Sequence, residues 1–356
     1  MRLITLRIGD FRNIADLAIS LHQGFNVFVG PNGSGKTSIL EAAYLLSHAQ
    51  SFRPGPNDAL IRTGTGGFTL FGEIQKAPGR TTLGLARASG SWMGKVNGEP
   101  IDQLSNLLRE SALVCLEPGS HALISGSSLL RRRFLDWGVF HVEPEHFERT
   151  RRFQRYLRQR NALLKRGAAT HEIEAWDEGF SLAGEAVAVA RERYFDGYRF
   201  YVNELLNTFL PELGSASISL TRGWARESTL AEALRHSRAK DIARGHTSRG
   251  PHRADWSVAF ERAPSRDYLS RGQEKLCAFA CVLAQAQMHA SIRQEWPVVA
   301  LDDLASELDE QHQEIVLSML IKSEAQVLIT GTHLSPSLDG LAGRAKVFHV
   351  EHGRIC

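Results

Sequence analysis

The most informative segment of this chain reads GPNGSGKT, residues Gly30-Pro31-Asn32-Gly33-Ser34-Gly35-Lys36-Thr37. It matches the pattern GxxxxGK[ST] in full, after the apolar segment Phe25–Val29 and before a helix predicted over residues 36–48. A strand, a glycine-rich loop and a helix N-terminus in this order point backbone N–H groups at bound phosphate. A glycine-rich turn that binds nothing is the alternative interpretation. The full motif in its expected context favours a phosphate-binding P-loop.

The residues of this loop and its helix start have distinct expected roles. Lys36 can neutralise the β- and γ-phosphates of a nucleotide, and the Thr37 hydroxyl can ligate Mg²⁺. The glycines allow the backbone to approach the phosphates closely. We expect the nucleotide to be bound by Gly30, Pro31, Asn32, Gly33, Ser34, Gly35, Lys36, Thr37 and Ser38.

Two adjacent carboxylates follow a second apolar strand, Val298–Leu301. A P-loop enzyme needs an acid at such a strand end to hold the Mg²⁺ shell, and Asp302 fits this position. Asp303 could orient or deprotonate the attacking water. The alternative interpretation is that both aspartates are simply solvated at a strand end, but the nearby P-loop motif favours a role at the nucleotide. We therefore expect Thr37 and Asp302 at the metal, and Asp303 together with Lys36 in catalysis.

A third segment, LSRGQEK at residues 269–275, resembles the LSGGQ signature of the ABC ATPase superfamily. The resemblance implies that Ser270, Gly272 and Gln273 engage ATP held by a second copy of the chain, with Ser270 acting in catalysis. The same residues also describe an ordinary capped helix, with Ser270 as N-cap and Gln273 at the third position, which does not exclude the function. Residues 306–309 (SELD) resemble the D-loop of that superfamily. His333 occupies the place of its switch residue, although a lone histidine is a weak signal.

Composition narrows the class of protein. The chain has 42 Lys and Arg against 39 Asp and Glu, a net charge of +3, with 43% hydrophobic residues. These values exclude a disordered chain, a collagen-like fibre and a small disulfide scaffold. The four cysteines include no CxxC pair, and no apolar run approaches the length of a membrane span. We expect a reduced, cytoplasmic protein without a membrane anchor.

The pattern along the chain indicates an α/β head interrupted by helices. Residues 67–100 alternate as antiparallel strands with a hairpin turn at Asn97-Gly98, whereas residues 129–210 are helical. A long amphipathic helix over 173–205 should pack against a helix over 144–165 as an antiparallel pair. The expected fold class is therefore α/β, and the resemblance to ABC ATPases implies an ABC-type ATPase head, a P-loop fold with an antiparallel β subdomain, carrying an inserted helical arm. The expected domains are 1–117 and 246–356 for the head and 118–245 for the arm.

The order of several further motifs is similar to the RecF family of bacterial recombination mediators, within the SMC and ABC-type ATPases. The motifs are FRN (11–13), SFR (51–53), RRRFLDW (131–137), GPHRAD (250–255), LSRGQEK and LDDLASELD. The resemblance runs essentially end to end. It implies ATP and Mg²⁺ as cofactors and an ATP-dependent homodimer on DNA. It also implies slow, DNA-stimulated hydrolysis that drives release, action at single-strand gap and duplex junctions, and cooperation with RecR and RecO in loading RecA. Roles in DNA repair, replication and the SOS response follow from the same family.

Two further residues are implied at the nucleotide, and one departure is visible. Asn13 and Arg53 are expected to approach it. The acid after Asp302 is Asp303, where transporter-type heads carry Glu, and no glutamine loop is clear after the first helix. A shorter acid would place water less readily, which fits a slow ATPase.

Basic residues gather in two segments. Residues 131–166 contain 11 Lys and Arg against 4 acids, and residues 235–253 contain 6 against 1. Such clusters can follow phosphates without reading bases, although a solvated arm face is the alternative for any one residue. The candidate DNA contacts are Arg131, Arg132, Arg152, Arg155 and Arg158. The roles of Arg131, Arg132 and Arg133 stay open at this point, between DNA, a dimer and an internal ion-pair network.

Two rival functions fit part of the sequence. Another SMC-like or transport-type ABC subunit would share the nucleotide motifs but not necessarily the basic arm. A structural adaptor with an inactive site would not need Lys36, Asp302 and Ser270 together. The complete motif set favours an ATP-gated DNA clamp.

Overall fold

The computed structural model describes residues 1–76, 79–334 and 343–356, which divide into two compact units. One, here called the head unit, contains residues 1–120 and 289–356, and the other, the arm unit, contains residues 121–288. The predicted α/β class with an interrupted head is confirmed. The second boundary lies after Met288, whereas the sequence suggested residue 245. Residues beyond 245 belong to the arm unit in part because β10 (Asp255–Phe260) pairs with β9 (Ala216–Thr221).

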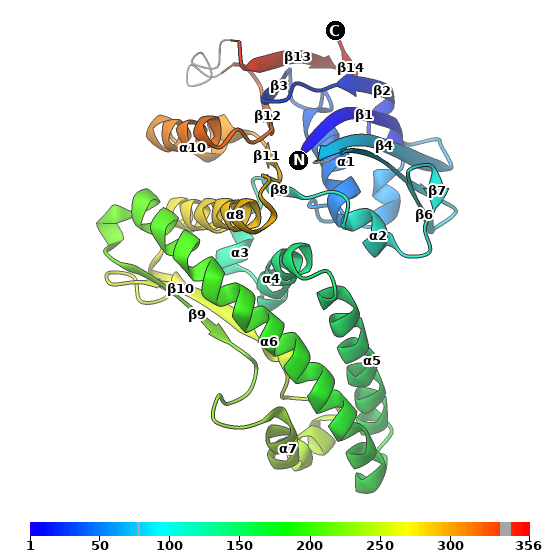
Figure 1. The fold of residues 1–356 in the computed structure, drawn as a ribbon, viewed down its shortest axis with the longest axis vertical. Helices are drawn as coiled ribbons and strands as arrows, with labels where there is room; N and C mark the ends of the chain where they lie inside the picture. Colours follow the sequence, from blue (N-terminus) through cyan, green and yellow to red (C-terminus); the bar gives the residue numbers. More distant parts are fainter. Residues whose placement is uncertain (77–78, 335–342) are drawn as a thin grey trace. The chain divides into compact units, whose positions relative to one another are not determined.

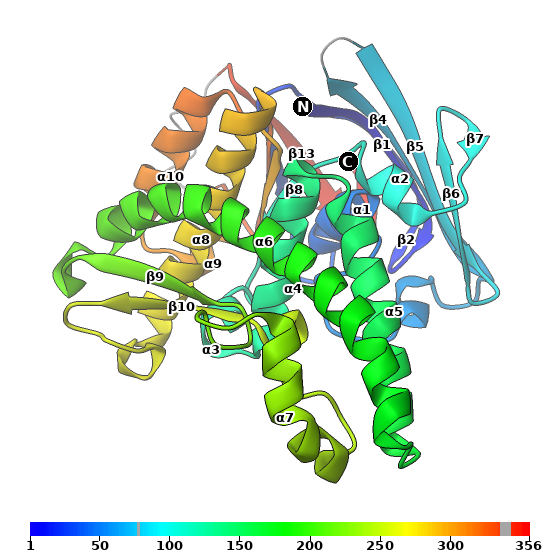
Figure 2. The ribbon, with the colours of Figure 1, turned by 60° about the horizontal axis from the view of Figure 1, so that its bottom comes forward.

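The first sheet of the head unit is antiparallel, with strand order β2-β1-β4-β5-β6-β7 (Figure 2). Alternation of buried and exposed residues along its strands gives the sheet one apolar face. Asn97 and Gly98 have φ of 51° and 85° and form the two-residue turn between β6 and β7, as predicted. The strands are β1 (Arg2–Phe11), β2 (Ile14–Ser20), β4 (Gly67–Lys76), β5 (Gly79–Ala88), β6 (Ser91–Val96) and β7 (Glu99–Pro100).

The second sheet of the head unit has the order β14-β13-β3-β12-β11-β8, in which every pair except β13 with β14 is parallel. Its three central strands are fully buried runs, as expected for a parallel sheet covered on both faces. The segments that follow β3, β11 and β12 therefore meet at one edge. The strands are β3 (Phe25–Val29), β8 (Leu113–Leu116), β11 (Val298–Leu301), β12 (Val327–Gly331), β13 (Ala345–Glu351) and β14 (Arg354–Ile355).

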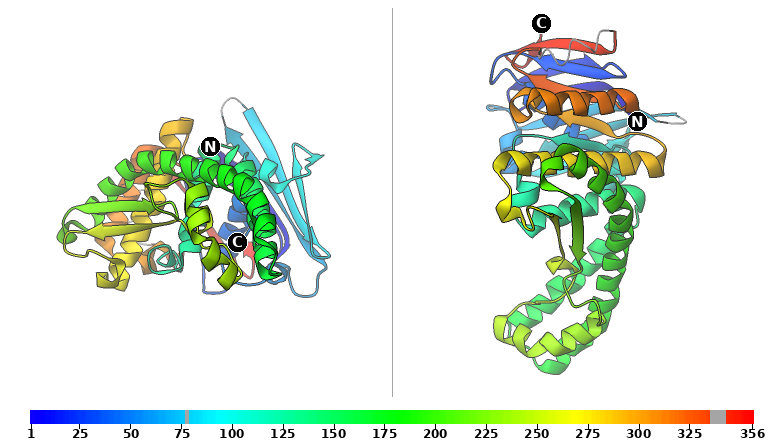
Figure 3. Two further views of the ribbon diagram at one scale, coloured as in Figure 1. Left: turned by 90° about the horizontal axis from the view of Figure 1, so that it is seen from below. Right: turned by 90° about the vertical axis from the view of Figure 1, so that its left-hand side faces the viewer.

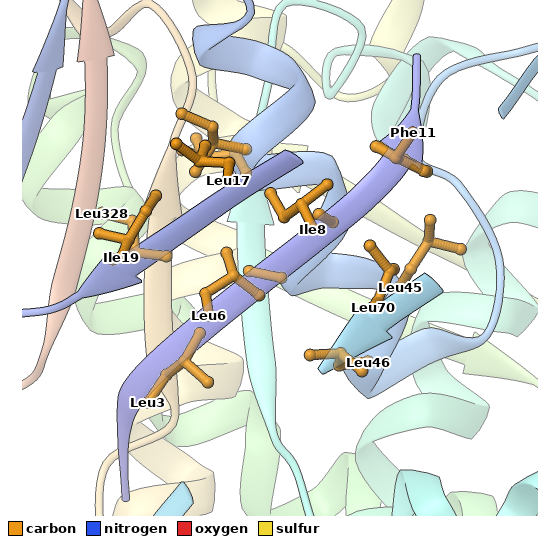
Figure 4. Close-up of a cluster of buried hydrophobic side chains, with 14 of the residues drawn as sticks. Leu3, Leu6, Ile8, Phe11, Leu17, Ile19, Leu45, Leu46, Leu70 and Leu328 are labelled. Carbon is orange, nitrogen blue, oxygen red and sulfur yellow. The ribbon is translucent and has the colours of Figure 1, made fainter. Parts of the chain in front are cut away.

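Helix α1 (Lys36–His48) packs between the two sheets of the head unit. Its apolar residues join those of β1, β2 and β4 in one hydrophobic cluster, in which Leu6, Phe11 and Leu45 are fully buried. Figure 4 shows Leu3, Leu6, Ile8 and Phe11 along β1 facing this cluster. Burial of apolar surface on both sides fixes the helix, and with it the loop that precedes it. The remaining head helices are α2 (Leu104–Leu108), α9 (Leu304–Glu307) and α10 (Glu310–Ser323).

The arm unit is built around two long helices. Helix α5 (His146–Lys165) and helix α6 (Thr170–Phe209) form an antiparallel pair joined by a short turn, close to the ranges predicted from periodicity (Figures 1 and 3). Phe153 of α5 and Phe180 of α6 meet edge to face in the core between them. The other elements are α3 (Ala122–Ser125), α4 (Ser128–Val142), α7 (Leu230–Arg244), the β9-β10 hairpin, and α8 (Arg271–Arg293), which continues into the head unit.

Candidate nucleotide-binding site

The P-loop has the backbone conformation of a phosphate cradle. Gly30, Gly33 and Gly35 have φ of 158°, 78° and 114°, and Gly35 is the N-cap of α1. A Cβ on Gly30 would lie 2.2 Å from the backbone oxygen of Val350, so no other residue fits there. The loop therefore wraps tightly at the N-terminus of a helix, where N–H groups and the helix dipole favour an anion.

Lys36 is held inside this cradle by the loop itself. Its side-chain nitrogen donates to the backbone oxygens of Gly30 and Pro31 at 2.7 and 2.9 Å. Burial lowers the pKa of Lys36, and the carboxylates of Asp303 and Asp302 oppose that shift. A buried cation of this kind is stabilised further when an anion enters the loop. The position matches the predicted role of Lys36.

The Thr37 hydroxyl and the Asp302 carboxylate meet as expected for a metal site. The hydroxyl donates to Oδ1 of Asp302 at 2.9 Å, and the Thr330 hydroxyl donates to the same oxygen at 2.6 Å. Burial raises the pKa of Asp302, and the two hydroxyl bonds and Arg53 oppose the rise while Asp303 adds to it. A desolvated carboxylate beside a hydroxyl is an oxygen donor set that fits Mg²⁺.

A dedicated protein cage for a metal is absent from the described ranges 1–76, 79–334 and 343–356, where no group of three or more His, Cys, Asp or Glu could hold one. Mg²⁺ does not need such a cage. It is usually bound through one or two protein oxygens together with substrate phosphates and water. Thr37 and Asp302 supply this pattern next to the phosphate cradle.

Asp303 has a strained backbone that fixes its direction. Its φ of 55° and ψ of 47° place it in the left-handed region, at the start of α9. Its N–H donates to the Thr330 hydroxyl at 2.9 Å, so Thr330 links both aspartates. Aspartate tolerates this region better than most residues, and such outliers gather at functional sites. The geometry places Asp303 beside the metal ligand and leaves it partly exposed.

The Asn13 side chain hydrogen-bonds to the P-loop and to the first turn of α1. Its amide nitrogen donates to the backbone oxygen of Gly33 at 3.0 Å, and its Oδ1 accepts from the Ser38 hydroxyl at 3.1 Å. The N–H of Gly353 donates to the backbone oxygen of Ser34 at 2.7 Å. Asn13 thus holds the P-loop in shape. The contribution of Gly353 was not anticipated, since its position in the β13-β14 turn gives no local signal.

Helix α1 also carries a buried ion pair that the sequence alone did not indicate. Glu41 is fully buried and accepts a two-pronged bond from Arg12, at 2.9 and 2.6 Å. The Ser51 hydroxyl donates to the same carboxylate, and Arg53 lies 3.6 Å from it with its side chain 45% exposed. Arg53 therefore reaches toward the site from the SFR motif, while Arg12 of the FRN motif is structural.

The signature segment forms a capped helix start in the arm unit. The N–H of Gln273 donates to the Ser270 hydroxyl at 3.3 Å, and the N–H of Ser270 donates to the Gln273 side chain at 3.0 Å. This is the capping box expected from the sequence. Ser270 and Gly272 are exposed, and the side-chain nitrogen of Gln273 also donates to Glu212 at 3.2 Å. The start of α8 is thus presented to solvent.

Arg131 requires a correction, because it is an internal residue. It is 7% exposed and donates two bonds to Asp255, at 2.7 and 3.0 Å. The same guanidinium donates to the backbone oxygens of Ile124 and Gly126 at 3.0 and 2.9 Å. Four of the five N–H donors of this buried guanidinium are thus engaged inside the fold, and burial keeps it from DNA phosphate. The expected DNA contact at Arg131 is therefore wrong, and the RRRFLDW and GPHRAD motifs meet in a structural pair.

The other candidate arginines differ in exposure. Arg132 is half-buried and donates to the backbone oxygen of Ala254 at 2.7 Å. Arg152, Arg155 and Arg158 are exposed along α5, and within the described chain none of the three forms an ion pair. A solvent-facing row of cations on α5 remains as the candidate phosphate contact from the predicted set.

The remaining motif residues lie at the same edge of the parallel sheet. Thr332 and His333 follow β12, which lies between β3 and β11, and the Thr332 hydroxyl is 2.9 Å from Nδ1 of His333. The SELD residues lie in α9 and just beyond it, after the paired aspartates. Topology thus brings the predicted switch and D-loop segments next to the P-loop.

The chain matches known proteins over its whole length. The family model of the RecF/RecN/SMC N-terminal domain matches residues 2–355. The DNA replication and repair protein RecF of Stenotrophomonas maltophilia is 45% identical over 361 residues, covering 100% of this chain and 99% of that protein. No described helix is long and apolar enough to cross a membrane.

Solved structures share the fold. A structure of the recombination mediator protein RecF with ATP in the RecFOR pathway superposes with a TM-score of 0.89 at 24% identity, covering 99% of this chain and 96% of that one. A crystal structure of an Smc head bound to the C-winged helix domain of ScpA superposes with a TM-score of 0.60 at 16% identity, covering 100% and 98%. With a P-loop, a family model that matches residues 2–355 and a relative 45% identical over the full length, the chain belongs to the RecF family of SMC-like, ATP-binding proteins.

Proposed function

We propose that this protein is an ATP-dependent, DNA-binding recombination mediator that dimerises on DNA and acts in the cytoplasm at junctions between single-strand gaps and duplex. It works with RecR and RecO to load RecA, in DNA repair, replication and the SOS response. The proposal rests on membership of the RecF family, whose relatives carry the names DNA replication and repair protein and recombination mediator. The observation that supports it most directly is the Thr37–Asp302 bond, which brings two oxygen donors suited to Mg²⁺ together beside an intact P-loop.

The chain's own residues divide the work at the nucleotide. The P-loop N–H groups and Lys36 bind the phosphates, and Thr37 and Asp302 orient the metal. When bound, Mg²⁺ neutralises charge that develops on the transferred phosphoryl group. Asp303, held by its backbone bond to Thr330, positions the attacking water and accepts its proton. Its short side chain reaches less far than a glutamate would, which supports slow hydrolysis.

The second half of the active site comes from another copy of the chain. Ser270 and the exposed N-terminus of α8 can receive a γ-phosphate held by a partner, because their capping box already orients the hydroxyl and the first N–H groups. ATP therefore joins two chains, and hydrolysis removes the group that joins them. Such a clamp closes on DNA with ATP and opens after hydrolysis.

The arm unit supplies the DNA contacts. Arg152, Arg155 and Arg158 form an exposed row on α5, which suits backbone phosphates and carries no base-reading geometry. Arg132, half-buried and bound to a backbone oxygen, contributes less. DNA held between two chains would stimulate hydrolysis by favouring the closed dimer.

One experiment tests this function. Wild type, Lys36→Met and Ser270→Arg are compared by size-exclusion chromatography with ATP, with and without duplex DNA, and nucleotide binding is measured with a fluorescent ATP analogue. Wild type should dimerise with ATP, Lys36→Met should fail to bind nucleotide, and Ser270→Arg should bind ATP yet stay monomeric. Normal ATP-dependent dimerisation of Ser270→Arg would contradict the shared site.

A further inference from the structure

A cavity in the arm unit is lined by four cations. Its volume is about 470 Å³, and Lys240, Arg244, Arg249 and Arg253 contribute to its wall. All four residues are exposed, and no carboxylate lines the cavity. Positive charges gathered around one concave surface create a strong local potential for an anion. None of these residues belongs to the nucleotide site or to the arginine row on α5.

The cations of this cavity have no compensating charge beside them, as is also true of the arginine row on α5. Within the described arm unit, none of the four cations forms an ion pair. Arg238, on the same helix α7, pairs with both Glu174 and Asp177. Many arginines elsewhere in the unit also have carboxylate partners, among them Arg149, Arg160, Arg191, Arg193 and Arg222. The cavity therefore concentrates cations whose counter-charge must come from outside the chain.

The loop that forms one wall of the cavity is anchored to a buried network. The N–H and the hydroxyl of Ser248 donate to Oδ1 of Asp241, at 3.0 and 2.6 Å. The other oxygen of Asp241 accepts from fully buried Arg160 at 2.8 Å. The N–H of Thr247 donates to Asn161 at 2.9 Å. Arg249 thus follows directly on a backbone that is fixed in place before any ligand arrives.

A close contact between two glycines brings the GPHRAD motif against the segment that follows β9. Gly223 and Gly250 have φ of 96° and 133°, and a Cβ on Gly223 would lie 2.2 Å from the backbone oxygen of Gly250. This close approach places Arg253 on the cavity wall beside Gly223. The backbone oxygen of Thr247 accepts from Nε2 of His252 at 3.0 Å, which ties the two ends of the loop together. A preorganised site loses little entropy on binding.

We propose that this cavity binds a phosphate group of a nucleic-acid strand, apart from the α5 row. Arg and Lys on a wall without carboxylates suit phosphate oxygens, because guanidinium groups donate in pairs to them. A terminal phosphomonoester and an internal phosphodiester share this chemistry. The inference rests on the proposed DNA binding and adds a fixed contact point in the arm, by which a strand can be held at one position.

The test uses the full-length protein and fluorescence anisotropy with ATP present. The variants are Arg244→Gln and Lys240→Gln/Arg244→Gln. The matched control is Arg235→Gln, an exposed arginine on the same helix about 180° from Arg244 at 3.6 residues per turn. The DNA probes are duplexes with a single-stranded overhang whose recessed strand ends in a 5′-phosphate or a 5′-hydroxyl. Binding of a fluorescent ATP analogue checks that the head is intact.

The double variant should bind DNA about tenfold more weakly or worse, while Arg235→Gln should bind as wild type. A loss confined to the 5′-phosphate probe assigns the cavity to a strand end, and an equal loss on both probes assigns it to an internal phosphate. If wild type binds DNA and the double variant binds it equally well, the inference about the cavity fails but the proposed function does not. If wild type binds no DNA, the proposed function fails with it. Equal DNA binding together with selective loss of a hexaglutamate peptide would identify a protein ligand instead.

Discussion

The hydroxyl of Thr37 lies 2.9 Å from a carboxylate oxygen of Asp302, across 265 positions of sequence. This bond joins the two ends of the interrupted head at one catalytic point. Thr330 adds a second hydroxyl to the same oxygen and at the same time holds the backbone of Asp303. The end of β12, the start of α1 and the two aspartates after β11 are thus connected through hydroxyl bonds.

Asp302→Asn should abolish most hydrolysis and yet stabilise the ligand-free protein. Burial raises the pKa of Asp302 above 3.8, so its stability contribution is present at low pH and lost as the pH rises through the folded pKa. At pH 7 the charged, desolvated Asp302 therefore lowers the stability of the ligand-free protein, and a bound cation would offset this loss. Hydrolysis should fall about 10²-fold or more, since metal stabilisation supplies several kcal/mol.

Thermal melting with and without Mg²⁺ and ATP measures both effects. Exposed Asp16→Asn on β2 is the control and should change neither. A ligand-free Asp302→Asn protein that melts below wild type at pH 7 would contradict this account of the carboxylate.

Arg12→Met should destabilise the head far more than Arg53→Met, although both arginines face the same carboxylate. Removing Arg12 leaves fully buried Glu41 without its two-pronged partner, which costs about 3–5 kcal/mol. Arg53 is 45% exposed and 3.6 Å away, so its loss should cost about 1 kcal/mol or less. Urea unfolding followed by intrinsic fluorescence measures the difference. Arg12→Met/Glu41→Gln should recover much of the loss, and a double variant as unstable as Arg12→Met would argue against a buried-charge penalty.

His252 should make the arm unit sensitive to mild acid. Burial lowers its pKa from 6.5 to about 4, with the positive charges of Arg253 and Arg132 adding to the shift and the Thr247 backbone bond and Asp241 opposing it. Below pH 6.5 the unfolded chain takes up a proton that the folded arm does not. Stability should therefore fall by up to about 3 kcal/mol between pH 6.5 and pH 4. His252→Gln keeps a donor for Thr247 and should flatten this dependence, whereas exposed His171→Gln should not.

Unfolding free energies at several pH values provide the measurement. Parallel curves for wild type and His252→Gln would show that another group carries the acid sensitivity.

The exposed row on α5 should set part of the salt dependence of DNA binding. Arg155→Gln/Arg158→Gln should reduce the log–log salt slope by about 1.8, or 0.9 for each phosphate contact removed. Arg193→Gln/Arg199→Gln on α6 is the matched control, because exposed Arg193 and partly exposed Arg199 already pair with Glu143 and Asp196. Anisotropy titrations at several salt concentrations give the slopes. An unchanged slope in the α5 variant would place the phosphate contacts elsewhere.

Local patterns predicted much of this fold. The P-loop, the Asn97-Gly98 turn, the buried strand before Asp302 and the long helix α6 all have signals within a few residues of themselves. Cys277 and Cys281 lie on a buried helix face, as their spacing suggests. Such features follow from periodicity and turn chemistry, which a single segment carries.

Long-range pairs could not be predicted in the same way. Arg131 reads as one of three consecutive surface arginines, and only its partner Asp255, 124 positions away, makes it internal. Glu41 similarly looks like an exposed position of an amphipathic helix until Arg12 is placed against it. Burial of a charge depends on a partner from elsewhere in the chain, and neither periodicity nor composition identifies that partner.

The bond from Gly353 to Ser34 has a consequence for how the protein is made. Synthesis delivers the P-loop early, but Asp302 and Gly353 leave the ribosome only after the whole arm unit has been translated. During synthesis the nucleotide pocket of the head is therefore still incomplete when the whole arm unit is available to fold. A chain that stops short of these last strands would carry a complete arm and yet be unable to trap ATP.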